Sequence, residues 1–141
     1  MKELATTNSE NKSKRLKIPS GSKWENIVGY SRVVRTGNIV EVAGTTSTND
    51  EGNVVGPGDP YLQTKFILEK ISTYLTKAGS SMEDVVRTRM FVTDINQWKD
   101  IGRAHGEFFK SIKPVASMLE VKRLIDPELL VEIEVTAIIS E

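Results

Sequence analysis

The chain has 141 residues, the length of one ordinary domain, and its 19 lysine and arginine side chains balance 19 aspartate and glutamate side chains. A net charge of zero provides no field to hold nucleic acid or an anionic membrane surface, so neither partner is expected. The absence of cysteine excludes disulfides, thiol nucleophiles and thiolate metal sites.

The first 20 residues are polar and rich in lysine. They offer too little apolar surface to offset the cost of ordering them, so we expect a flexible N-terminal arm over residues 1–20 and a single domain over residues 21–141. No apolar run in the chain has the length that a signal peptide or a membrane helix needs. A cytoplasmic protein is therefore expected.

Two strands are predicted within the stretch YSRVVRTGNIVEVAGT, residues 30–45. Its β-branched residues lie on both sides of a Thr-Gly-Asn turn, which is the pattern of a hairpin. The following turn-rich stretch ends in Asp59 and Pro60, an N-cap followed by proline at the first helical position. A helix is expected from there to Gly79, because apolar residues recur every three or four positions. They are Leu62, Phe66, Ile67, Ile71, Tyr74, Leu75 and Ala78.

The second half of the chain predicts a third strand over residues 85–93, a second amphipathic helix from Trp98 to Ile112, and two final strands over residues 115–121 and 131–139. The order is β-β-α-β-α-β-β. The strand at residues 131–139 is apolar at nearly every position, which implies cover on both sheet faces, yet two helices shield only one. We therefore expect a homo-oligomer that buries the other face and has sites between its subunits.

Glu132 and Glu134 interrupt the most apolar stretch of the chain and share one face of their strand. In the preceding strand, Glu120 shares a face with Ala116 and Met118. If the two strands pair as a hairpin, three carboxylates lie together. Two interpretations remain open: a solvated face, or a water-poor cleft between subunits that raises the pKa of a carboxyl toward the range useful for acid–base catalysis.

The other motifs favour structural roles. The glycine-rich GNVVGPG has neither dinucleotide-fingerprint nor P-loop spacing and is interpreted as a surface turn. His105 is the only histidine and lies on the apolar stripe of the second helix. Without a second histidine or a serine nucleophile elbow it forms no triad or metal site, so we expect a packing histidine with one hydrogen bond and no metal.

Several segments together resemble the RidA/YjgF family from about Tyr30 to Ile139. They are GNIVEVAGTT, LTKAGSSMEDVVRTRMFVTDI, HGEFF, Pro114, LEV and VEIE. The resemblance implies a chorismate-mutase-like α/β (α+β) fold with two helices on one face of a mixed sheet, assembled as a homotrimer with a barrel-like core and three inter-subunit clefts. Archetypal members are enamine/imine deaminases that hydrolyse 2-iminobutanoate or 2-iminopropanoate without a cofactor.

The resemblance also implies roles for individual residues. Glu132 corresponds to the glutamate that orients the attacking water, Tyr30 to a tyrosine at the cleft mouth, and Gly44 to a glycine whose backbone holds the substrate; Thr45, next to it, is also expected to contact the ligand. The arginine that grips the substrate carboxylate is replaced by Ala116. The cysteine of the cleft is replaced by Met118, and an asparagine by Gly102.

Loss of the arginine clamp leaves two functions open. One is hydrolytic deamination of an altered small enamine or imine, with weak or no activity on 2-iminobutanoate; the other is non-catalytic binding of a small metabolite by the same trimer. A ribonuclease activity fits the zero net charge poorly. Arg32 shares a strand face with Tyr30 and is a candidate for the missing positive charge of the cleft. Its alternative is an ion pair with a surface acid such as Glu41.

Overall fold

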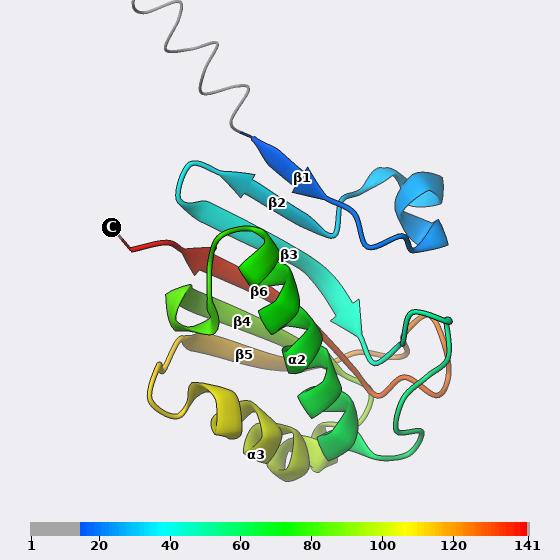
Figure 1. Ribbon diagram of the computed structural model, residues 1–141. Helices are drawn as coiled ribbons and strands as arrows, with labels where there is room; N and C mark the ends of the chain where they lie inside the picture. The colour runs from blue at the N-terminus through cyan, green and yellow to red at the C-terminus, as the bar shows by residue number, and fades with distance from the viewer. Residues whose placement is uncertain (1–14, 141) are drawn as a thin grey trace, which may run out of the picture.

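The computed structural model describes residues 15–140, which form one six-stranded sheet with two helices against one face (Figure 1). The strands are β1 (Leu16–Ile18), β2 (Val33–Thr36), β3 (Ile39–Thr46), β4 (Val85–Val92), β5 (Val115–Glu120) and β6 (Val131–Ile138). Their spatial order is β1-β2-β3-β6-β4-β5. Only β4 and β5 are parallel neighbours. The expected α+β architecture with a mixed sheet is confirmed.

The helices are α2 (Pro60–Lys77) and α3 (Trp98–Phe109). The side chain of Asp59 accepts a hydrogen bond from the backbone N–H of Leu62 at 3.0 Å, so the predicted N-cap is confirmed. After β1 the helices and strands follow the predicted order β-β-α-β-α-β-β. Three short helical turns join them: η1 (Glu25–Gly29), η2 (Met82–Asp84) and η3 (Ile95–Gln97).

Part of the expected N-terminal arm belongs to the sheet. Leu16–Ile18 form β1 and pair with β2 in antiparallel fashion at the sheet edge. A short edge strand is stabilised by backbone pairing and needs little apolar surface, which is why the polar composition gives no sign of it. Residues 1–14 of the arm expected over residues 1–20 lie outside the described residues.

The last two strands do not pair as a hairpin, because β4 lies between them. Met90 of β4 aligns with Met118 of β5 on one side and with Ile133 of β6 on the other. The connection from β4 to β5 contains α3, and a helical crossover of this kind joins parallel strands. Glu120 therefore aligns with Val92 and faces the helices, on the opposite side of the sheet from Glu132. The interpretation with three carboxylates on one face is wrong.

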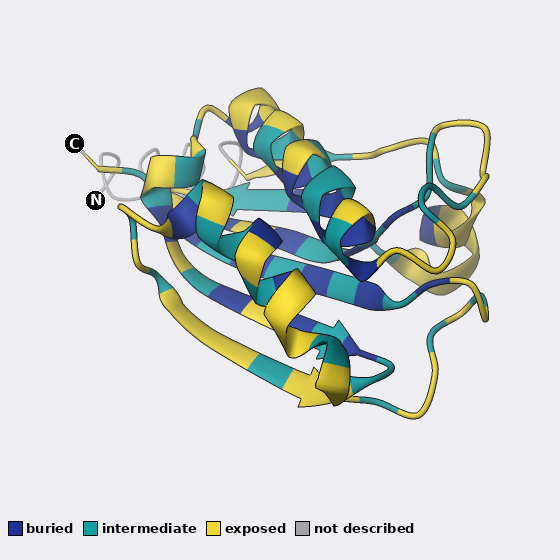
Figure 2. Cartoon of the chain, turned by 90° about the horizontal axis from the view of Figure 1, so that it is seen from below, coloured by how far each residue is buried: buried dark blue, intermediate teal, exposed yellow. Residues whose placement is uncertain are grey.

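The core lies between the sheet and the two helices, as the dark blue segments of Figure 2 show. In β6 the odd-numbered residues from Val131 to Ala137 are buried against this core, and the even-numbered ones lie on the other face. No helix of the described residues covers that other face (Figures 1 and 2). Two helices therefore shield one face only, as predicted.

Gln63 connects α2 to the start of β6. It is fully buried, and its Nε2 donates to the carbonyls of Gly56 at 3.0 Å and Glu128 at 2.9 Å. Its Oε1 accepts from the backbone N–H of Leu130 at 2.8 Å. Because β6 begins at the next residue, this amide fixes where the strand enters the sheet and therefore where Glu132 lies.

We predict that Gln63→Leu lowers the free energy of unfolding by about 3 kcal/mol, because it leaves two carbonyls and one N–H without their partner. Urea denaturation at fixed protein concentration measures the change. The control is Glu69→Leu on the exposed side of the same helix, which should change stability by less than about 0.5 kcal/mol. Equal losses in the two variants would contradict a role for the amide.

Candidate functional site

The carboxylate of Glu132 lies directly against the backbone of Gly44. β3 carries a bulge between Val42 and Thr45, where its register against β6 shifts. A Cβ atom at Gly44 would collide with Oε2 of Glu132 and come within 3.0 Å of its Cδ. Glycine at this position therefore creates the space that the glutamate occupies. Two of the residues expected at the site, Gly44 and Glu132, are in contact.

Glu132 is half-buried at the end of the uncovered sheet face. Burial raises the pKa of its carboxyl, because a low-dielectric environment disfavours the charged form. The positive charge of Arg32 lowers this pKa, and the neighbouring carboxylate of Glu134 raises it further. The net direction is upward, which brings the carboxyl closer to the pH at which it can exchange a proton with a bound molecule.

Arg32 is buried beside the bulge, with 8% of its surface exposed. Its Nη1 donates to the Gly44 carbonyl at 2.6 Å and to the Thr45 hydroxyl at 3.3 Å. Its Nη2 donates to the Tyr30 hydroxyl at 3.2 Å. Four of the residues expected to bind ligand, namely Tyr30, Arg32, Gly44 and Thr45, are thus joined by one guanidinium.

The guanidinium of Arg32 forms an ion pair with Glu25 rather than with Glu41. Its Nε lies 3.9 Å from Oε2 of Glu25, which is also buried. Glu25 accepts further hydrogen bonds from the backbone N–H and the hydroxyl of Ser20. Glu41 is on the uncovered face and accepts from Thr136. Arg32 therefore acts on Glu132 through its charge and on Gly44 through a hydrogen bond.

Lys70 supplies a second cation near the end of β3. Its ammonium donates to the carbonyls of Thr46 at 3.2 Å and Thr48 at 2.7 Å. The pKa of Lys70 is lowered to about 8: burial is the largest cause, the positive charge of Arg32 acts in the same direction, and Asp50 opposes them. The sequence pattern did not identify Lys70 or Glu25. Lys70 could have been noticed, because it borders the apolar stripe of α2; Glu25 lies in an irregular segment that carries no periodic signal.

Ala116 and Met118 lie apart from this group. They align with Thr88 and Met90 of β4, on the face that the helices cover. Ala116 is nevertheless exposed, and a Cβ atom at Gly102 of α3 would meet nothing within 4 Å. Within one chain Ala116 and Met118, on the edge strand β5, are therefore separate from the group around Glu132, because β4 lies between β5 and β6.

His105 packs between α3 and the sheet. Its Nε2 lies 2.9 Å from the hydroxyl of Thr88, and its ring stacks at a tilt on Phe109 with centroids 4.6 Å apart. Burial lowers the pKa of the imidazole. The prediction of a packing histidine with one hydrogen bond is confirmed.

Neither a metal cluster nor a membrane span is found in residues 15–140. No three or more His, Asp or Glu side chains in this part of the chain are close enough together to hold a metal ion. None of its helices is long and apolar enough to cross a membrane.

Comparison with known proteins agrees with the fold and with the motifs. The model of the family described as Endoribonuclease L-PSP matches residues 21–139. The uncharacterized protein SCO2049 of Streptomyces coelicolor is 39% identical over 121 residues, which are 86% of this chain and 90% of that protein. A RutC family protein of Pyrococcus abyssi is 33% identical over 77% of this chain and 84% of its own length.

Solved structures give the same result. The crystal structure of Rv2704 from Mycobacterium tuberculosis, a member of the YjgF/YER057c/UK114 family, has a TM-score of 0.80 and 47% identity, and the match covers 89% of this chain and 99% of that one. The YjgF gene product of E. coli has a TM-score of 0.74 and 26% identity over 86% of this chain and 93% of its own. This chain therefore belongs to the RidA/YjgF family, whose family model carries the description Endoribonuclease L-PSP.

Proposed function

We propose that the chain binds a small imine or enamine at Glu132 and hydrolyses it to a carbonyl compound and ammonia. The observation that carries the proposal is the half-buried Glu132 carboxyl against Gly44, with its pKa raised by burial. The nearby charge of Arg32 favours a ligand with negative charge or a transition state that develops it.

The chemistry needs one water and one group that accepts and returns a proton. The carboxylate of Glu132 accepts a proton from a water molecule while the oxygen of that water bonds to the carbon of the C=N group. The nitrogen takes a proton from solvent, which the hydroxyl proton lost in the last step replaces, and the tetrahedral carbinolamine forms. Glu132 then donates its proton to the nitrogen as the C–N bond breaks, and the hydroxyl proton is lost as the C=O bond forms. The products are one carbonyl compound and one ammonia, with no oxidant or cofactor consumed.

We propose a homotrimer as the active form. The uncovered sheet face supports assembly, since its large apolar side chains remain exposed; they are Ile39, Val115, Leu119 and Ile138. The separation of Ala116 and Met118 from Glu132 supports a cleft to which two copies contribute, one with each group.

Ala116 bears on the choice of substrate. The guanidinium of an arginine at this position could hold a substrate carboxylate by two hydrogen bonds, and the methyl group of alanine cannot. We therefore infer a substrate other than a small 2-imino acid. The same observation favours a second candidate, non-catalytic binding of a small metabolite in the same cleft.

Glu132→Gln should reduce imine hydrolysis by about 100-fold or more, because the amide cannot accept the proton of water. Ammonia release from a panel of freshly generated imines measures the rate. The control is Glu128→Gln, an exposed glutamate before β6, which should retain the parent rate. If the parent releases no ammonia from any imine but binds carbonyl analogues, the binding function is supported and the catalytic one is contradicted.

The stability of Glu132→Gln should depend on pH with a definite sign. Because the folded-state pKa of Glu132 is raised, its contribution to stability is greatest at low pH and is lost as the pH rises through that pKa. The variant should therefore unfold at the same or a higher temperature than the parent at pH 7, with no such advantage below pH 4. Thermal unfolding followed by circular dichroism tests this, and a variant less stable at pH 7 only would contradict it.

Ala116→Arg should raise the turnover of 2-iminobutanoate by about 10-fold or more, because it restores a bidentate contact to the substrate carboxylate. An imine without a carboxylate serves as the control substrate and should gain nothing. A parent protein that already hydrolyses 2-iminobutanoate as fast as its other imines would contradict the inferred change of substrate.

A further inference from the structure

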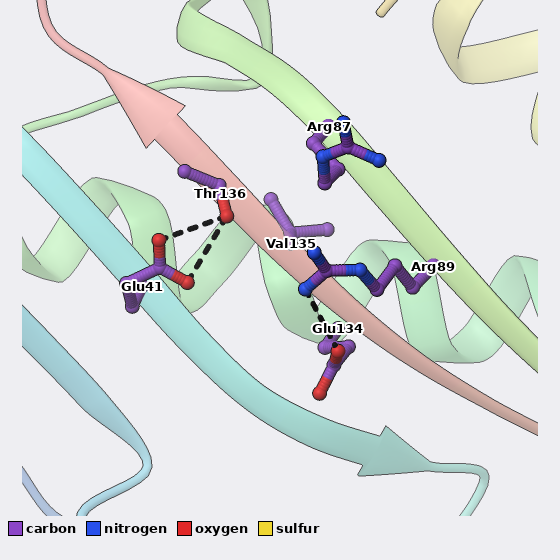
Figure 3. Close-up of a pocket in the computed structure, with 6 residues that line it drawn as sticks. All are labelled: Glu41, Arg87, Arg89, Glu134, Val135 and Thr136. Carbon is purple, nitrogen blue, oxygen red and sulfur yellow. Dashed lines mark hydrogen bonds and ion pairs between the residues drawn. The ribbon is translucent and has the colours of Figure 1, made fainter. Parts of the chain in front are cut away.

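A charged hollow of about 110 Å³ lies on the uncovered sheet face. Figure 3 shows that its side chains come from three adjacent strands: β3 contributes Glu41, β6 contributes Glu134 and Thr136, and β4 contributes Arg87 and Arg89. The hollow is separate from the Arg32 network, and the proposed reaction uses none of its residues.

Two of the four charges are paired within the chain. Nη1 of Arg89 lies 3.3 Å from Oε1 of Glu134. Glu41 accepts hydrogen bonds from the Thr136 hydroxyl at 2.9 and 3.0 Å but has no cation partner among residues 15–140. Arg87 likewise forms no ion pair in the described part of the chain. Arg87 and Glu41 are therefore without an oppositely charged partner among residues 15–140.

Arg87 and Glu41 do not pair with each other in the described part of the chain. Both align with Thr136, one from each side of β6. Two strand spacings therefore separate their backbones, roughly 9–10 Å. The side chain of Thr136 stands between them, as Figure 3 shows. Any partner that covers this face must supply a negative group for Arg87 and a positive group for Glu41, because a buried charge without a partner is costly.

A second copy of this chain meets both requirements with the same patch. Apolar side chains border the charges: Ile39 and Ile138 lie toward one end of β3 and β6, and Val115 and Leu119 lie on β5, each more than 40% exposed. The patch has two arginines and two glutamates, so identical copies do not repel one another. An acidic or a basic partner would satisfy one of the unpaired charges and leave the other.

We propose that Arg87 forms an ion pair with Glu41 of a neighbouring copy, and that this pair selects the alignment in which the sheet faces meet. In a closed ring each copy donates one Arg87 and one Glu41, so every charge is satisfied. The proposal rests on the self-association proposed above, and it adds the contact that specifies the alignment.

Charge reversal on the full-length chain tests the pair. Arg87→Glu and Glu41→Arg, each alone, place like charges together across the interface and should raise the midpoint concentration of dissociation at least tenfold in sedimentation velocity. The double variant restores opposite charges and should return to within about threefold of the parent. Arg87→Gln removes the charge without adding repulsion and should weaken association less than Arg87→Glu.

Lys99→Glu, an exposed charge reversal on α3, is the control and should associate like the parent. Circular dichroism checks that each variant is folded. The ion pair is overturned if both single reversals assemble as well as the parent, or if the double variant associates no more strongly than the single ones. In either case the proposed oligomer is not contradicted, provided that the parent assembles. A parent that stays monomeric at tens of micromolar overturns both the pair and the oligomer.

Discussion

The hydrogen bond between the Arg32 guanidinium and the Gly44 carbonyl holds together the part of the fold that makes the candidate site. Gly44 lies in a bulge where β3 changes register against β6, and only a residue without a Cβ leaves space there for Glu132. A buried guanidinium is costly unless its charge and its N–H groups find partners. Glu25, the bulge backbone and the hydroxyls of Thr45 and Tyr30 provide them. Site geometry and local stability thus depend on the same cation.

The two faces of the sheet have different chemistry for a physical reason. Most buried side chains of the helix-covered face are apolar, because they are removed from water within one chain. The other face alternates apolar and charged residues, such as Ile39 and Glu41 on β3. A face of this kind can be exposed to solvent in a folded monomer, because its charged side chains are hydrated. It can also be buried against a complementary surface when the chain assembles.

Periodicity and capping were sufficient to predict both helices, the order of the elements and the uncovered face, because these follow from local spacing and from Asp59, Pro60 and Gly79. The order in which the strands pair within the sheet was harder to predict. The sequence of β5 and β6 is compatible with a hairpin, and only the helical crossover through α3 explains why β4 separates them. In the site, Tyr30 and Arg32 are joined by a hydrogen bond, as their expected shared face suggested, although both precede β2, which begins at Val33. Glu25 was missed because it lies in an irregular segment and reaches Arg32 through a contact that no short-range pattern records. Lys70 was missed although it borders the apolar stripe of α2.

The central strand of the sheet is also the last one made. β6 pairs with β3 on one side and β4 on the other, and its Thr136 bonds Glu41 from 95 residues away. During synthesis the inner edges of β3 and β4 therefore stay open until residues 131–138 leave the ribosome. Such non-local closure slows folding, and open strand edges invite pairing with other nascent chains. The unfinished chain is therefore most open to such pairing between the synthesis of α3 and that of β6.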